Sequence, residues 1–303
     1  MTQLPRESPD GPPTATKRHR LHSSQVGIDV SALTHPGLVR PNNEDQFFVT
    51  QLTRSLETIL TSLPDGAVPD RADEINYAMI VADGMGGHAA GEVASRMVIS
   101  TLVSLALDIP DWIFKVDPEH APEIERRARR AVQQVATTVV SRGREDEALR
   151  GMGSTLTAAR SFGDDLLVVH VGDSRAYLFR AGRLHRLTKD HTYAQLLIDT
   201  GQLTAGEAAV SKMRHVLTNV LGGSDDEVQV DVDLLRLENG DRLLLCSDGL
   251  TDLVDDDTIG TTLSGLPRSS EACARLVQLA LDGGGRDNIT VIVAAYTVPE
   301  QRG

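Results

Sequence analysis

The sequence has 303 residues and a formal net charge of −13, with 40% hydrophobic and 3% aromatic residues. This hydrophobic fraction can form a large core of Leu, Val, Ile and Ala, so the composition excludes a globally disordered chain. The acidic excess argues against nucleic acid or an anionic membrane as the main partner, because both require a basic surface.

The chain is expected to form one domain with short tails. Residues 1–24 are rich in proline, serine and charge and predict a disordered tail. The domain is expected over residues 25–298, followed by a C-terminal tail at 299–303. Cys246 and Cys273 lie in apolar segments and are expected to be reduced core thiols. No apolar run reaches the length of a membrane span and no signal peptide is evident, which favours a soluble, cytoplasmic protein.

Helical and strand-like segments both occur in the predicted domain. Apolar residues at helical spacing predict helices over 92–107, 122–142 and 269–281. Short segments rich in branched side chains predict strands over 78–82, 154–160, 165–171, 175–180, 183–187, 241–246 and 288–296. The segments 52–75 and 108–121 carry proline and aspartate and are expected to be loop insertions. Tight turns between successive strands, such as Ala181-Gly182, imply antiparallel sheets with helices packed outside them.

Carboxylates recur where the predicted strands begin or end. Asp83 follows the apolar run 78–82, and three glycines follow it within four residues. Similar positions are occupied by Glu44, Asp45, Asp173, Asp248 and Asp287. Any one of them could be an ordinary turn or helix-cap residue. Their repetition at the edges of core strands favours a shared site.

A shared site of carboxylates needs a cation. Carboxylates in one place repel one another, and burying even one costs several kcal/mol unless it is neutralised. Mg²⁺ or Mn²⁺ fits better than Zn²⁺, because the sequence has no Cys-x-x-Cys and no paired-histidine helix motif. The glycines would let the backbone approach the ion, with the carbonyl of Gly84 as a ligand. The alternative, a dinucleotide-binding loop from Gly84 to Ala89, is disfavoured because Asp83 would repel a pyrophosphate.

Arg40 lies four residues before Glu44 and points to a phosphoryl substrate, because a guanidinium group matches the oxygens of a phosphate. The alternative is an ion pair with Glu44 or Asp45. Two metal ions could lower the pKa of a bridging water and clamp the phosphoryl oxygens. Such a site would suit the hydrolysis of a phosphate monoester, because this reaction is among the slowest without a catalyst and requires a large rate enhancement.

Seven motifs in sequence order resemble the bacterial branch of the metal-dependent PPM (PP2C-type) serine/threonine protein phosphatases. They are RPNNED, VADGMGGHAAGE, GMGSTLTAA, VVHVGDSRAYLFR, LTKDHT, CSDGL and GGGRDNITVIV. The resemblance covers about residues 25–297. It implies an α+β fold, a four-layer αββα sandwich of two antiparallel sheets flanked by helices, with the metal centre at one end.

The resemblance also implies a role for each candidate residue. Asp83 would bridge two metal ions, Gly84 would supply its carbonyl, and Asp248 and Asp287 would complete the shell of one ion. Glu44 and Asp45 would hold metal-bound water, and Arg40 would bind phosphate. Asp173, together with Asp248, would support a third, weaker metal ion, and Ser211 is aligned with a serine near that ion in the mobile flap, here residues 191–224.

One departure concerns the proton donor. Eukaryotic members of the family carry a histidine directly after Asp-Gly, and this sequence has Met85 there. A metal-bound water is favoured over His88 as the proton donor. For His191, as for His88, a structural role and a role in the chemistry are both open. The flap contains the sequence TAGE at 204–207, which predicts a helix capping box and therefore short helices in the flap.

These observations predict a Mn²⁺- or Mg²⁺-dependent protein serine/threonine phosphatase with two or three ions. A metal-activated water would hydrolyse phosphomonoesters on phosphoproteins, opposing bacterial serine/threonine kinases. No nucleic acid or membrane partner is expected, and the protein is expected to be a monomer. Two alternatives remain open. One is a phosphatase of an anti-anti-sigma-type regulator, and the other is an inactive pseudophosphatase that acts as a binding module.

Overall fold

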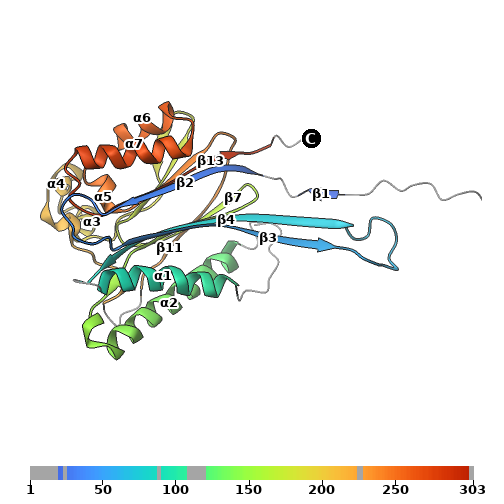
Figure 1. Ribbon diagram of the computed structural model, residues 1–303, viewed down its shortest axis with the longest axis horizontal. Coiled ribbons are helices and arrows are strands. Elements are labelled where there is room, and N and C mark those ends of the chain that lie inside the picture. Colours follow the sequence, from blue (N-terminus) through green and yellow to red (C-terminus); the bar gives the residue numbers. More distant parts are fainter. Residues whose placement is uncertain (1–19, 23–25, 87–89, 108–120, 224–227, 300–303) are drawn as a thin grey trace, which may run out of the picture.

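The computed structural model describes residues 20–22, 26–86, 90–107, 121–223 and 228–299. Two β-sheets pack face to face, and helices cover the outer face of each (Figure 1). The pairings are antiparallel except for one short parallel pair between β1 (Arg20–His22) and β4 (Arg71–Met85). The predicted four-layer sandwich is therefore confirmed.

The first sheet has eight strands, and β4 runs through its centre. The strands follow the order β10-β5-β4-β6-β7-β11, with β3 and β1 also paired to β4. Their bounds are β3 (Asp45–Glu57), β5 (Gly153–Ser154), β6 (Leu156–Phe162), β7 (Asp165–Val171), β10 (Leu221–Gly222) and β11 (Asp231–Arg236). Two helices cover this sheet, α1 (Ala90–Leu107) and α2 (Ala121–Glu145). A short 3₁₀ helix, η1 (Glu147–Leu149), follows α2.

The second sheet has five strands in the order β2-β13-β12-β8-β9. Their bounds are β2 (Gly27–His35), β8 (Arg175–Arg180), β9 (Arg183–Arg186), β12 (Arg242–Cys246) and β13 (Ile289–Thr297). The helices α5 (Asp248–Thr251), α6 (Asp256–Gly265) and α7 (Ser269–Asp282) lie on its outer side. The β8–β9 hairpin turns at Ala181-Gly182, as predicted, and both residues have positive φ.

Three apolar clusters hold these layers together. One lies between the first sheet and α1 and α2, one between the second sheet and its helices, and one between the two sheets. Strand β4 contributes to two of them, because Ile80 faces α1 and α2 while Met79 and Val81 face the other sheet. Burial on both faces explains why the central strands appear in the sequence as continuous apolar runs.

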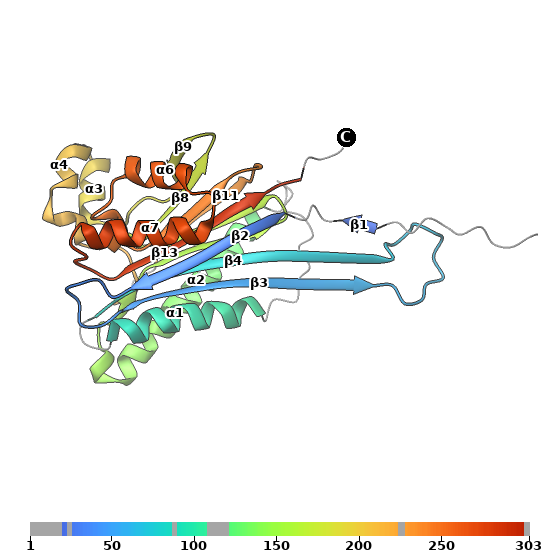
Figure 2. The same cartoon turned by 45° about the horizontal axis from the view of Figure 1, so that its top comes forward.

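Several predictions about the chain need correction. The segment 52–75 is a loop only over residues 58–70, because β3 and β4 pair from Asp45↔Asp83 out to Glu57↔Arg71 and project from the sandwich as a long two-stranded arm (Figure 2). Arg20–His22 belong to the predicted disordered tail but pair with β4 as β1. Apart from Ala121, the first residue of α2, the segment 108–121 lies outside the described residues, as do residues 1–19 and 300–303.

Helix α1 has the length and the apolar composition of a membrane-spanning helix. It has 18 residues and a mean hydropathy of 1.4, so by length and composition alone it could cross a membrane. The sequence-based statement that no apolar run reaches this length was therefore too strong. In the fold, α1 packs its Ala90, Ala94 and Val98 face into the cluster under the first sheet. This core position accounts for the apolar residues on that face, and a third of the helix is buried.

Candidate functional site

Asp83 and Asp45 face each other across the ends of two strands. They are paired residues of the antiparallel β3–β4 ladder. Asp45 is 1% exposed and accepts a hydrogen bond on Oδ2 from the hydroxyl of Ser247, at 2.7 Å. Ser247 directly follows β12 of the other sheet. The ends of both sheets therefore meet at this carboxylate pair.

A hydroxyl network joins Asp83 to the segment that carries Asp173. The amide of Asp83 donates to Thr155 Oγ1 at 3.0 Å, and the amide of Thr155 donates to the Asp83 carbonyl at 2.9 Å. Thr155 Oγ1 lies 2.8 Å from Ser174 Oγ. Asp173, the neighbour of Ser174, is 7% exposed. Thr155 and Ser174 thus fix the two aspartates relative to each other.

The loop that carries Arg40 is tied to the start of β13. The Asn288 side chain accepts from the amide of Glu44 at 2.7 Å and donates to the carbonyls of Pro36 and Asn42. Arg40 forms an ion pair with Asp287, with Nη2 and Oδ2 2.6 Å apart. The ion pair expected as the alternative was with Glu44 or Asp45, so the structure assigns a different partner. The Arg40 side chain is 57% exposed.

Glu44 and Gly84 sit against the start of α1. The Glu44 carbonyl accepts from Ser95 Oγ at 2.6 Å and from the amide of Gly84 at 3.2 Å. A Cβ on Gly84 would lie 2.1 Å from the carbonyl oxygen of Gly91, and a Cβ on Gly91 would lie 2.3 Å from Glu44 Oε2. A Cβ on Gly91 would also lie 2.9 Å from the carbonyl carbon of Gly84, so only a hydrogen fits at either position where these two backbones meet.

The clustered carboxylates have raised pKa values. Burial raises the pKa of Asp45 to about 6 and that of Asp173 to about 7. The pKa values of Asp83 and Asp248 are raised well above the usual range, first by burial and then by the charges of neighbouring carboxylates. For Asp83 those neighbours are Asp45, Asp248, Asp173 and Asp287. Burial also raises the pKa of Glu44, against the opposing effect of Arg40.

The flap contains the predicted short helices. They are α3 (Tyr193–Asp199), α4 (Ala205–Ala209) and the 3₁₀ helix η2 (Lys212–His215). Thr204 and Glu207 form the predicted capping box at the start of α4.

Ser211 is not joined to the acidic cluster by any hydrogen bond within the described part of the chain. Its hydroxyl caps η2 by accepting from the amide of Met213. The flap reaches the cluster through Arg214 and His215 instead, which lie 3.8 and 3.4 Å from Asp252 Oδ2. His215, Asp248 and Asp252 place ligand-type atoms within 4.8 Å of one another.

Asp252 and His215 were missed from the sequence. Asp252 stands in the same stretch as Asp248, SDGLTD, and its position one helical turn later was the available signal.

His191 has a structural role. Its Nδ1 accepts from the amide of Gly172 at 3.2 Å and from Asn219 Nδ2 at 2.8 Å. Nε2 lies 3.0 Å from Asp231 Oδ2, so the proton is assigned to Nε2, which donates to the carboxylate. His191 therefore anchors both ends of the flap. His88 lies outside the described residues.

The donor set fits a hard divalent cation. Its side chains supply carboxylate oxygens, and Asp45 Oδ1 is a buried oxygen with no hydrogen-bond partner among the described residues. Buried carboxylates that raise one another's pKa are stabilised when a cation replaces their protons. The arginines that the described residues bring near the cluster have other partners or lie at its edge: Arg40 is paired with Asp287, Arg175 is paired with Asp190, and Arg214 approaches Asp252. Mg²⁺ or Mn²⁺ suits such an all-oxygen site.

Known proteins of similar sequence are bacterial protein phosphatases. The chain is 40% identical over 266 residues to the serine/threonine protein phosphatase PstP of Mycobacterium tuberculosis, covering 87% of this chain and 44% of PstP. The chain thus spans less than half the length of that relative. It is 31% identical over 278 residues to the protein phosphatase PhpP of Streptococcus pneumoniae, covering 88% of this chain and 97% of PhpP.

Solved structures show the same fold. The crystal structure of the M. tuberculosis phosphatase PstP/Ppp matches with a TM-score of 0.70 and 38% identity, covering 88% of this chain and 98% of that one. The PstP catalytic domain in complex with two manganese ions matches with a TM-score of 0.69 and 36% identity, covering 90% and 100%. The sequence profile described as protein phosphatase 2C matches residues 65–280. This chain therefore belongs to the protein phosphatase 2C family.

Proposed function

We propose that this protein is a Mn²⁺- or Mg²⁺-dependent protein serine/threonine phosphatase. The observation that carries the proposal is the convergence of Asp45, Asp83, Asp173 and Asp248, whose pKa values are all raised, beside an ion-paired arginine. Such a group can hold divalent cations next to a phosphate-binding guanidinium. The names of the relatives PstP and PhpP supply the substrate class, which is phosphorylated protein.

Each residue has a proposed task. Asp83, Asp248 and Asp287 would hold the cations, together with the Gly84 carbonyl, and Asp173 would contribute to a third site. Glu44 and Asp45 would orient water at the cluster. Bound divalent ions supply positive charge that makes water more acidic and neutralises phosphoryl oxygens. Ser211 has no support as a ligand from the described contacts, and Asp252 is better placed for that part of the site.

Arg40 would bind and orient the phosphoryl group. In the described conformation its guanidinium is held by Asp287, so substrate phosphate would compete for, or share, the same donors. Because the side chain is more than half exposed, it can reach an incoming phosphate without crossing the core. Its fork of donors matches two phosphoryl oxygens, which a lysine could not reproduce.

The test is hydrolysis of p-nitrophenyl phosphate and of phosphoserine, phosphothreonine and phosphotyrosine peptides. We expect turnover that requires Mn²⁺ or Mg²⁺, favours the serine and threonine peptides, and disappears in Asp83→Asn and Asp248→Asn. Arg40→Ala should mainly raise KM, whereas the exposed control Arg183→Ala should leave both constants unchanged. Full turnover in excess EDTA would refute the proposal.

The client proteins, the oligomeric state and the location are also part of the proposed function. We propose clients phosphorylated by serine/threonine kinases, a monomeric state and a cytoplasmic location. No described contact favours an anti-anti-sigma-type client. The pseudophosphatase alternative is disfavoured because the sequence retains an aspartate at each predicted metal-site position. Gel filtration with light scattering tests the monomer, and a phosphopeptide panel tests the client class.

A further inference from the structure

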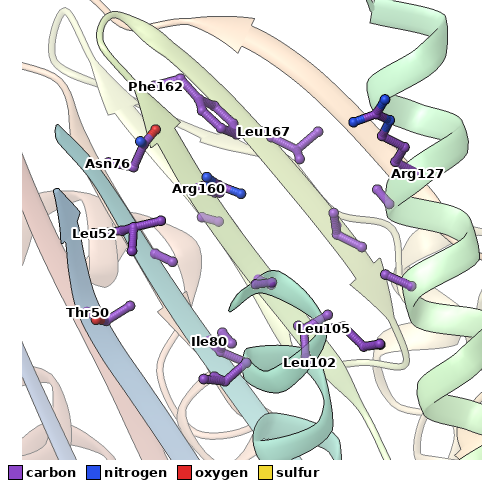
Figure 3. Close-up of a pocket in the computed structure, with 18 of the residues that line it drawn as sticks. Thr50, Leu52, Asn76, Ile80, Leu102, Leu105, Arg127, Arg160, Phe162 and Leu167 are labelled. Atoms are coloured by element: carbon purple, nitrogen blue, oxygen red, sulfur yellow. The ribbon is translucent and has the colours of Figure 1, made fainter. Parts of the chain in front are cut away.

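A second site is suggested by a pocket on the opposite face of the first sheet. The pocket has a volume of about 250 Å³ and lies between the sheet and the helices α1 and α2 (Figure 3). Its walls are mostly apolar and include Leu102 and Leu105 of α1, Ala131 of α2 and Leu167 of β7. Pockets of this kind bind the apolar part of small molecules, and a few polar groups then set the orientation.

One end of the pocket is polar and incompletely hydrogen-bonded. Glu74 and Asn76 of β4 both line it, although they are only 7% and 1% exposed. Asn76 Nδ2 donates to Glu74 Oε1 at 3.0 Å. Glu74 Oε2 and Asn76 Oδ1 have no hydrogen-bond partner among the described residues. Buried acceptors left in this state are costly, so they point to a group that would donate to them.

Arg160 of β6 adds a donor at the same end. It pairs with Ala78 in the ladder, next to the pair Asn76↔Phe162. Its guanidinium carbon lies 4.4 Å from the centre of the Phe162 ring, and burial lowers its pKa. No carboxylate of the described residues lies within ion-pairing distance of it, although the charge of Glu74 acts on it. A ligand head group could therefore accept from Arg160 and donate to Glu74 and Asn76.

The volume limits the size of the ligand. A buried apolar cavity of about 150 Å³ can hold benzene, which has six carbon atoms. By the same ratio, a pocket of about 250 Å³ accommodates about ten non-hydrogen atoms. An eight-carbon chain with a two-atom head group has this size.

We propose that this pocket binds a medium-chain amphiphile with an uncharged head group that both donates and accepts hydrogen bonds, such as a primary carboxamide. The carbonyl would accept from Arg160, and the amide nitrogen would donate to Asn76 Oδ1 and Glu74 Oε2. The chain would lie along Leu102 and Leu105. Arg54 and Arg127 also line the pocket. A carboxylate of equal length could pair with Arg160, but it fits less well because it has no donor for Glu74 Oε2 and Asn76 Oδ1 and would face the charge of Glu74.

The test is isothermal titration calorimetry of the full chain with octanamide, compared with octanoate. We expect saturable one-to-one binding of octanamide and binding of octanoate at least about tenfold weaker, a difference of about 1.4 kcal/mol. Asn76→Leu should weaken octanamide binding by about tenfold or more, and Ala131→Leu should abolish it by filling the pocket. The exposed control Asn239→Leu should bind like the wild type.

Each alternative result overturns the proposal. If octanamide shows no saturable binding to the wild type, the pocket belongs to solvent or to a neighbouring stretch of the chain. Equal affinities for octanamide and octanoate, or unchanged binding in Asn76→Leu, would remove the assigned head-group chemistry. Metal-dependent hydrolysis of p-nitrophenyl phosphate is measured on every variant to show that the variant is folded. This activity does not involve the pocket residues.

Discussion

The buried carboxylate of Asp45 allows a test of charge repulsion in the cation-free protein. Its pKa in the fold is about 6, against an ordinary value of 3.8. Because the folded pKa is raised, the fold favours the neutral form. The resulting stability is fully present below pH 3.8 and is lost as the pH rises through about 6. The difference of about 2.2 pH units corresponds to about 3 kcal/mol at 1.36 kcal/mol per unit.

Asp45→Asn should therefore stabilise the protein in EDTA at pH 7.5. The amide is neutral, and its oxygen can still accept from Ser247. We expect the free energy of unfolding to rise by about 1–3 kcal/mol, and Tm to rise by about 2–4 °C for each kcal/mol. At pH 5, about midway between the unfolded and folded pKa values, the gain should fall to about half, and it should approach zero only below pH 3.8.

Urea unfolding at both pH values, with EDTA or with Mn²⁺, measures these differences. In Mn²⁺ the wild type should become more stable than Asp45→Asn, because the Asp45 carboxylate attracts the cation and the amide that replaces it does not. Asp65→Asn, in the exposed loop between β3 and β4, controls for the general loss of a negative charge. A lower free energy of unfolding for Asp45→Asn in EDTA at pH 7.5 would refute the idea that uncompensated charge governs this site.

Three further predictions concern the contacts around the cluster. Gly91→Ala should lower the free energy of unfolding by about 1–3 kcal/mol in urea titration, since its Cβ would lie 2.9 Å from the backbone carbonyl carbon of Gly84 as well as 2.3 Å from Glu44 Oε2, whereas Gly206→Ala, with open space around it, should not. Asn288→Ala should cost about 2–4 kcal/mol and raise KM for p-nitrophenyl phosphate, because three hydrogen bonds that hold the Arg40 loop are lost. A normal KM would show that this loop does not position Arg40. His191→Ala should speed limited proteolysis within residues 200–216, measured by mass spectrometry, because it releases Asn219 and Gly172. Unchanged cleavage would contradict the anchoring role of His191.

Sequence patterns predicted the core strands well where both faces of the strand are buried. The run 78–82 lies inside β4, and the predicted strands 165–171 and 175–180 match β7 and β8. The outer half of the β3–β4 arm was missed because its β3 residues are largely exposed and the buried residues on its β4 side, Glu74 and Asn76, are polar, so neither strand leaves an apolar pattern. Strand β2 was also missed, since most of its residues are only partly buried.

The acidic residues of the site could be predicted from the sequence, but the residues that hold them in place by hydrogen bonds could not. Asp83 and Asp248 stand out because each ends an apolar strand, which is a local pattern. Asn288 and Ser247 act on partners more than 200 residues away, and no local pattern signals those hydrogen bonds. Ser211 was proposed by likeness to the family, but in the structure it is a helix cap.

The alternation of β4 explains why the acidic cluster and the pocket do not interfere. Asp83 is separated from Val81 and Met79 by two and four residues, so its side chain points to the same face, the interior between the sheets. There β12 ends shortly before Asp248, and β13 begins shortly after Asp287. Its partner Asp45 lies on the same face because cross-strand pairs share a side. Glu74, Asn76 and Ile80 have the opposite parity and face α1 and α2. One strand thus presents charge to one layer and a ligand pocket to the other.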